Sequence, residues 1–222
     1  MKITKIIGKK MYLQQLTESH ATETYNNWLN DSDITKFLCV KSSTIESLIT
    51  FINNCNSNNN ILLFGIFVIN NDLPQGFAPE MKHLRDLPQG FVPKEALPQG
   101  FAPKEALPQG FAPKEALHIG NVKIEKNKMD KYEIGILIGN KNYHSNGYGT
   151  DSMITMLNYF FNIYTTINEI YLGVHIDNII AINCYKKIGF IIIDNTNENC
   201  IKMQLLRTDF YRINYDDITT YN

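Results

Sequence analysis

The 222-residue sequence lacks a marked net charge, a long apolar run and any closely spaced pair of cysteines. Its formal net charge of -1 gives no electrostatic basis for binding nucleic acid or an anionic membrane. No stretch reaches the roughly 18 apolar residues of a membrane span, and the apolar parts of the basic start are too short for a signal peptide. We therefore expect a soluble, cytoplasmic protein without nucleic-acid or membrane partners.

The four cysteines form no CxxC pair and no spacing typical of a metal site: Cys39, Cys55, Cys184 and Cys200. Free thiols in a reducing compartment are the simplest interpretation. The sequence accordingly predicts no bound metal.

Proline is absent from most of the chain, because all eight prolines lie between residues 74 and 113. In this region the unit LPQGF(V/A)PKEA occurs three times over residues 87–116, after an imperfect copy that begins at Leu73. Residues 73–116 contain no Ile and no Asn, although these two types make up 56 of the 222 residues. The composition indicates that the repeat segment differs in origin from its surroundings.

The repeat segment is expected to form a flexible, partly extended loop. Its regularly spaced prolines remove amide donors and restrict the preceding residues, so neither a helix nor a central strand can continue. The flanking residues 61–72 and 118–126 are rich in β-branched and aromatic types, as strands are. Without residues 73–116, an Asn-Asn-Asp turn would join them. The sequence predicts a single domain over residues 1–222, interrupted by a repeat insertion in a hairpin tip.

The rest of the chain carries a mixture of helical and strand patterns. A capping-box pattern at residues 43–46 predicts the start of one helix. The Asn-rich tract 53–60 is expected to be a loop, and the tail beyond Arg207 is polar. Helices are predicted over residues 17–29, 44–54, 148–163 and 178–187, and strands follow the hairpin at 131–139, 169–176, 190–194 and 201–207. This order predicts a mixed α and β fold.

The stretch HSNGYGTDS, residues 144–152, lies between a predicted strand and a predicted helix. Its small residues leave backbone amides accessible, and a helix N-terminus adds roughly half a positive charge. Neither GxGxxG nor GxxxxGK[ST] is present, and a lone glycine turn is more often only a turn. The stretch is therefore a candidate pyrophosphate loop that needs support from other residues.

Two motifs in combination supply this support, because together they resemble the GNAT superfamily of N-acetyltransferases. The superfamily's pyrophosphate loop reads [Q/R]-x-x-G-x-[G/A]; Gly147 and Gly149 match it, whereas His144 stands where Gln or Arg is usual. Residues 12–38 are similar to the opening of the subgroup that includes ribosomal-protein-alanine and amino-sugar acetyltransferases. A later motif, N-x-x-A-x-x-x-Y-x-K-x-G-F, is matched by Asn178, Ala181, Tyr185, Lys187, Gly189 and Phe190.

The resemblance implies an α/β (α+β) fold: a GNAT-like mixed, mostly antiparallel sheet, splayed between two central parallel strands, with helices on both faces. The strands at 131–139 and 169–176 would border the gap that holds the pantetheine arm of acetyl-CoA. The arm would pair with backbone near Ile136 and Ile138. The resemblance places the pyrophosphate on the loop residues His144, Ser145, Asn146, Gly147, Tyr148, Gly149 and Thr150.

Acetyl transfer from a thioester to an amine needs a neutral amine and an acid for the leaving thiolate. The resemblance assigns the acid to Tyr185 and a bond to the pantetheine arm to Asn178. These residues are seven apart, so they share a helical face. A tyrosine packed in the core is the alternative.

The base is less clearly marked. Glu133 alternates with Gly135 on its predicted strand, which puts a carboxylate beside a small residue; a solvated strand-end charge is an equally good interpretation. His175 and Asp177 compete for the role, and water can also remove the proton. His118, at the edge of the repeat, is expected at the surface.

The sequence predicts an N-acetyltransferase that moves an acetyl group from acetyl-CoA to a small primary amine. An amino-sugar nucleotide is the first choice, since residues 28–38 resemble that branch most. A protein N-terminal acetyltransferase of the ribosomal-protein type is the alternative. A non-catalytic scaffold that presents the repeat to a partner is a further alternative. The sequence is also compatible with a homodimer.

Overall fold

The structure is a computed structural model that describes residues 5–38, 42–68, 116–197 and 199–215. Nearly all of the repeat segment lies outside these residues, so its loop conformation and its place in a hairpin tip stay predictions. The strands on either side of it, 61–68 and 117–126, pair antiparallel with each other. Within the described ranges no helix is long and apolar enough to cross a membrane.

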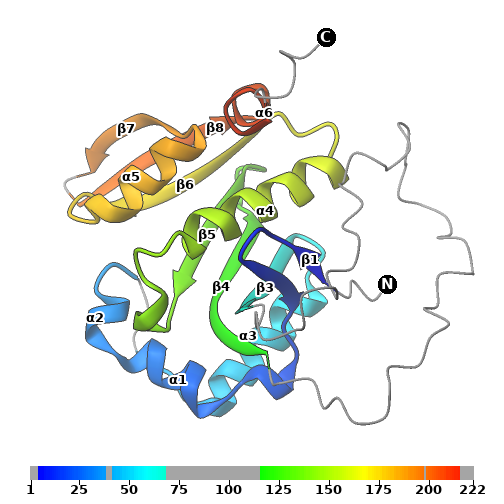
Figure 1. The fold of residues 1–222 in the computed structure, drawn as a ribbon, viewed down its shortest axis with the longest axis vertical. Coiled ribbons are helices and arrows are strands. Elements are labelled where there is room, and N and C mark those ends of the chain that lie inside the picture. The colour runs from blue at the N-terminus through cyan, green and yellow to red at the C-terminus, as the bar shows by residue number, and fades with distance from the viewer. Residues whose placement is uncertain (1–4, 39–41, 69–115, 198, 216–222) are drawn as a thin grey trace, which may run out of the picture. The chain divides into compact units, whose positions relative to one another are not determined.

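The described strands form one eight-stranded sheet in the order β1-β2-β3-β4-β5-β6-β8-β7. Every neighbouring pair is antiparallel except β5 and β6, which run parallel (Figure 1). The strands are β1 (Ile6–Ile7), β2 (Met11–Gln15), β3 (Ile61–Val68), β4 (Leu117–Lys126), β5 (Tyr132–Ile138), β6 (Glu169–His175), β7 (Ile191–Asn197) and β8 (Cys200–Leu206).

The sheet opens between β5 and β6. These strands are in register at one pair only, Glu133 with Tyr171. By contrast, β4 pairs with β5 at seven positions and β6 pairs with β8 at seven positions. The predicted mixed sheet, mostly antiparallel and splayed between two central parallel strands, is confirmed.

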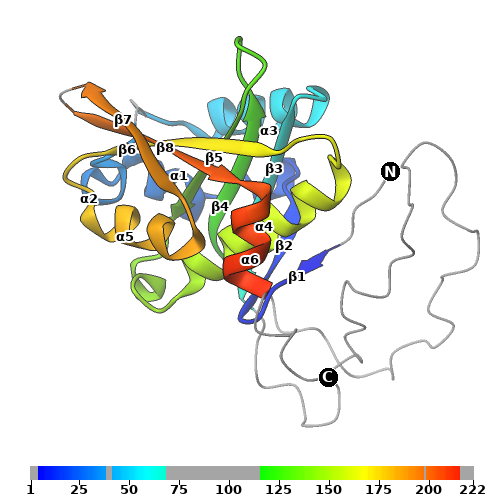
Figure 2. The same cartoon turned by 90° about the horizontal axis from the view of Figure 1, so that it is seen from above.

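Helices cover both faces of the sheet, as predicted (Figures 1 and 2). The core on one face includes residues of α4, α5 and α6, and the core on the other includes residues of α1 and α3. Alternate residues of β2 enter different cores, as the two-residue period of a strand requires: Met11 enters the first and Tyr12 the second. The helices are α1 (Glu23–Asn30), α2 (Ser32–Thr35), α3 (Ile45–Ser57), α4 (Tyr148–Ile163), α5 (Ile179–Ile188) and α6 (Arg207–Tyr215), with the 3-10 turns η1 (Glu18–His20) and η3 (Lys141–Tyr143).

The helix predicted over residues 17–29 is wrong in one respect, because it is interrupted. The turn η1 and the helix α1 are separate, and Thr22 caps α1 by accepting a hydrogen bond from Tyr25 N at 3.2 Å. A threonine hydroxyl favours this capping geometry over a helix interior. The apolar spacing was therefore read correctly, but the break was missed.

The capping box of α3 lies one residue later than predicted. Thr44 Oγ1 accepts from Ser47 N at 3.2 Å, and Ser47 Oγ accepts from Thr44 N at 2.9 Å. The helix also continues to Ser57, so most of the tract predicted as a loop is helical. Asn56 holds this end in place by donating from Nδ2 to Leu16 O at 2.8 Å.

The described part of the polar tail is helical, because α6 covers Arg207–Tyr215. Phe210 is fully buried and packs against Phe161 of α4, with ring centroids 5.6 Å apart. Arg207 Nη1 donates to Thr165 O at 2.7 Å. The sequence pattern of this segment, with few apolar residues on one side, was too weak to predict a helix here.

Candidate active site

The gap beside β5 leaves alternate backbone groups of this strand exposed. Gly139 N donates to Ile119 O at 2.9 Å, which marks this pair as hydrogen-bonded in the β4–β5 ladder. Bonded and non-bonded pairs alternate along an antiparallel ladder. Ile136 and Ile138 therefore direct their N–H and C=O groups away from β4 and toward β6, which has already diverged. The family resemblance places the pantetheine arm along this edge.

His144 is turned back onto this strand. Its Nε2 donates to Ile138 O at 2.8 Å, and its backbone N donates to Lys141 O at 3.1 Å. The imidazole therefore anchors the loop to β5 instead of extending from it. Of the predicted loop residues, His144 therefore has the fewest free hydrogen-bond donors for a phosphate.

The residues after His144 present accessible backbone donors. Ser145 (φ 59°) and Gly147 (φ 83°) are both left-handed, a backbone pattern that forms anion-binding concavities. Among the described residues, no hydrogen bond occupies the N–H groups of residues 145–150. Helix α4 begins here, with Asp151 N donating to Gly147 O at 3.0 Å. The loop thus combines free amides with a helix N-terminus, an arrangement suited to a pyrophosphate.

A turn between β1 and β2 packs against the start of α4. The Asp151 carboxylate accepts from Lys9 N at 3.1 Å and from Lys10 N at 2.7 Å. A Cβ at Gly8 would lie 2.9 Å from Asp151 Oδ2, so glycine allows this approach. Lys10 Nζ then reaches Asn146 O at 2.8 Å. Sequence reasoning missed Lys10, because it lies 136 residues from Asn146 and belongs to neither motif.

Tyr185 lies on α5 and is only 8% exposed. Its ring centroid is 6.0 Å from that of Phe190, and within the described part of the chain its hydroxyl makes no hydrogen bond. Burial raises the pKa of Tyr185 above its ordinary value, at which a phenol is already protonated at neutral pH. A buried phenol that retains its proton and lacks a protein partner can act as an acid.

The motif residues around Tyr185 also determine the ends of α5. Asn178 caps its start, with Oδ1 accepting from Ala181 N at 3.3 Å. Gly189, at φ 113°, ends it in the left-handed conformation, as predicted. The Asn178 side-chain amide makes no further hydrogen bond with the described residues, so its N–H groups remain able to donate to a ligand.

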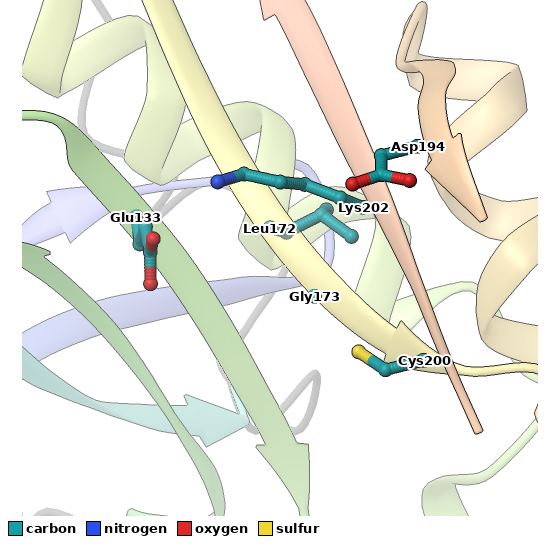
Figure 3. Close-up of a pocket in the computed structure, with 6 residues that line it drawn as sticks. All are labelled: Glu133, Leu172, Gly173, Asp194, Cys200 and Lys202. Carbon is teal, nitrogen blue, oxygen red and sulfur yellow. The ribbon is translucent and has the colours of Figure 1, made fainter. Parts of the chain in front are cut away.

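A pocket of about 240 Å³ opens on the sheet face opposite α4, and its lining residues are Glu133, Leu172, Gly173, Asp194, Cys200 and Lys202 (Figure 3). Glu133 enters from β5, and its Oε1 accepts from Asn127 Nδ2 at 2.7 Å. The side chain of Lys202 extends across β6 toward Glu133 (Figure 3). A Cβ at Gly135 would meet no atom within 4 Å, so the strand beside Glu133 is open.

The competing bases lie elsewhere. His175 and Asp177 are at the end of β6, and neither lines this pocket. His175 Nδ1 accepts from Asp177 N at 3.2 Å, and the ring packs on Phe37 at 5.1 Å between centroids. Glu133 is therefore the one of these three candidates that lines the pocket.

The prediction that His118 is a surface residue is wrong. Its ring stacks on Phe67 and lies edge-on to Trp28, with centroids 4.9 and 5.1 Å away. Its Nε2 lies 2.9 Å from both Gly120 O and Asn121 Oδ1. Burial is the main cause that lowers the pKa of His118 to about 4. The residue is a neutral part of the core beneath α1.

No group of three or more His, Cys, Asp or Glu side chains gathers as a metal site in the ranges that the structure describes. The candidate groups are instead backbone amides, one tyrosine, one asparagine and one carboxylate. This set is suited to proton transfer and to hydrogen bonding with a ligand backbone.

Comparison with known proteins agrees with this arrangement. Residues 10–191 match the family described as acetyltransferase (GNAT) domain. No curated protein sequence matches the chain.

Solved structures share the fold at low sequence identity. The acetyltransferase (GNAT family) from Bacillus anthracis is 17% identical, with a TM-score of 0.60 over 91% of this chain and 98% of its own. Spermidine N-acetyltransferase from Vibrio cholerae, in complex with CoA and spermine, is 16% identical, with a TM-score of 0.61 over 90% and 98%. A provisionally assigned ribosomal-protein-serine acetyltransferase from Vibrio cholerae is 13% identical, with a TM-score of 0.59 over 93% and 99%. At these identities the likeness concerns the fold.

Proposed function

Because the chain belongs to the acetyltransferase (GNAT) family, whose members use acetyl-CoA, we propose that it transfers the acetyl group of acetyl-CoA to a primary amine of a small molecule. The observation that carries this proposal is the splayed gap. It has unpaired backbone on β5, free amides at the start of α4 and the protonated Tyr185 on α5. Each feature matches one part of a thioester cofactor with a long polar arm.

We assign acetyl-CoA binding to backbone and amide donors. The N–H and C=O groups of Ile136 and the N–H group of Ile138 would pair with the pantetheine arm, and the Asn178 amide would donate to it; the Ile138 carbonyl accepts from His144. The amides of residues 145–150 would hold the pyrophosphate. His144 would act by anchoring this loop to β5, through its bond to Ile138 O.

The chemistry follows from two proton transfers. The neutral amine attacks the thioester carbonyl, the C–S bond breaks, and the leaving thiolate takes the proton of the Tyr185 hydroxyl. Glu133 receives the proton that the amine releases, directly or through a water molecule. Glu133 then releases this proton to solvent, and solvent returns a proton to Tyr185.

Replacing Glu133 with glutamine is expected to lower kcat about 100-fold, which is the lower end of the range for the loss of a general base. The amide keeps the size of the side chain but cannot accept the proton, so acetyl-CoA binding should persist. Steady-state kinetics against pH would test this, with Asp177→Asn as the control at the competing position. A full loss in the Asp177 variant and none in the Glu133 variant would reverse the assignment.

The acceptor is proposed from the sequence and from the pocket together. Residues 28–38 favour an amino-sugar nucleotide, and Lys202 is the cation that the pocket lining offers to an anionic acceptor. Glu133 is placed to attract the ammonium form of any amine. A ribosomal-protein N-terminus is the alternative, and the fold is shared by relatives of both the small-amine and the protein type. Rates with amino-sugar nucleotides, polyamines and N-terminal peptides would separate these classes.

The repeat segment is proposed as a passenger, and one experiment tests this together with acetyl-CoA binding. Calorimetry is expected to give similar micromolar affinities for the full chain and for a chain that lacks residues 73–116, because closing a long loop adds little entropy cost. The absence of binding to both chains would contradict the enzyme and support the scaffold alternative. Binding that requires the repeat would contradict the passenger role.

A further inference from the structure

We propose that Lys10 binds a phosphate group of acetyl-CoA. This inference rests on the proposed binding of acetyl-CoA at the loop before α4. It concerns a residue far from both motifs, on the turn between β1 and β2. The residue would add a full positive charge to a site that otherwise consists of backbone amides.

The position of the Lys10 ammonium is the first argument. Its Nζ lies 2.8 Å from Asn146 O, and 3.4 Å from where a Cβ of Gly147 would be. The ammonium therefore lies directly on the loop whose N–H groups have no partner among the described residues. An ammonium has three donors, and the bond to Asn146 O uses one of them. The others remain for an anion at the same loop.

The backbone of Lys10 is held in place, which is the second argument. Asp151 accepts from the N–H groups of both Lys9 and Lys10, and Gly8 N donates to Met11 O at 2.8 Å within the turn. The absence of a Cβ at Gly8 allows the turn to pack against α4. Only the side chain of Lys10 must be ordered when a ligand binds, so less entropy opposes the contact.

The neighbouring charges are the third argument. Lys141 is engaged by Asp31 at 2.8 Å and by Asp33 at 3.0 Å, on the other side of the loop. His144 donates to Ile138 O. The Asp151 carboxylate is the opposing charge, but two backbone amides already solvate it. Lys10 is thus the cation that contacts the loop with donors to spare.

Calorimetry with the full chain tests the proposal. The variant Lys10→Met removes the charge but keeps the apolar stem, and we expect it to bind acetyl-CoA about 10- to 100-fold more weakly, as for a lost charge-assisted hydrogen bond. Lys10→Arg should retain most of the affinity, and Lys9→Met is the matched control on the same turn. S-acetyl-pantetheine, which carries no phosphate group, should bind all four proteins alike.

The phosphate involved can be distinguished in the same experiment. If Lys10 binds the pyrophosphate, acetyl-3′-dephospho-CoA should still bind Lys10→Met more weakly than the unchanged chain. If Lys10 binds the 3′-phosphate, the two proteins should have equal affinities for this compound. Equal affinity of the unchanged chain and Lys10→Met for acetyl-CoA would overturn the inference, and so would an equal loss with S-acetyl-pantetheine. Failure of the unchanged chain to bind acetyl-CoA would overturn the proposed function as well.

Discussion

Replacing Tyr185 with phenylalanine is expected to lower kcat about 100- to 10,000-fold, the range for a lost general acid. The hydroxyl is buried, keeps its proton at neutral pH and makes no hydrogen bond within the described ranges. Phenylalanine fills the same volume, so the packing of α5 and the affinity for acetyl-CoA should change little. Steady-state kinetics combined with calorimetry would separate the two effects.

Tyr159→Phe is the matched control for this variant. Tyr159 lies on α4, and burial is the main cause that raises its pKa to about 12. Its ring packs edge-on to Phe64 at 5.8 Å. Removing this hydroxyl should leave kcat nearly unchanged. Equal losses in both variants would point to a structural cause, and no loss in either would exclude Tyr185 as the acid.

The parts of the fold that were predicted correctly are those determined by nearby residues. Helix α4 matches its predicted bounds, because its buried apolar residues recur at helical spacing and enter one core. Helix α5 is similar, since Asn178 and Gly189 give it a cap at each end. The splay of the sheet was predicted only through the family resemblance, because no local pattern shows where two parallel strands diverge.

The parts that were missed depend on contacts between distant segments. Lys10 reaches the loop before α4 only because the turn between β1 and β2 packs against the start of α4, and nothing near Lys10 in the sequence indicates this. Helix α6 is stabilised by packing of Phe210 on Phe161. The prediction that His118 lies at the surface was wrong for the same reason. Its neighbours in the sequence, Leu117 and Ile119, do not show what surrounds it, whereas its neighbours in space are aromatic.

The buried environment of His118 has a consequence for stability. Burial is the main cause that lowers its pKa from 6.5 to about 4, and burial also lowers the pKa of His20, whose ring centroid is 6.3 Å from that of His118. Between pH 6.5 and 4 the unfolded chain binds a proton at His118 that the folded chain does not. The free energy of unfolding should therefore fall as the pH falls through this range, by about 3 kcal/mol once pH 4 is passed.

Chemical denaturation at a series of pH values between 7.5 and 4.5 would measure this fall. His118→Gln should be less stable than the parent at pH 7, because it loses the stacking on Phe67 and Trp28, but its stability should depend less on pH. His175→Gln, at a position outside this aromatic core, is the control for the loss of an imidazole. Carboxylates also titrate in this range, so the difference between the slopes isolates His118. An unchanged slope in His118→Gln would mean that the ring already accepts a proton in the folded chain, and that its aromatic contacts leave water access to Nδ1.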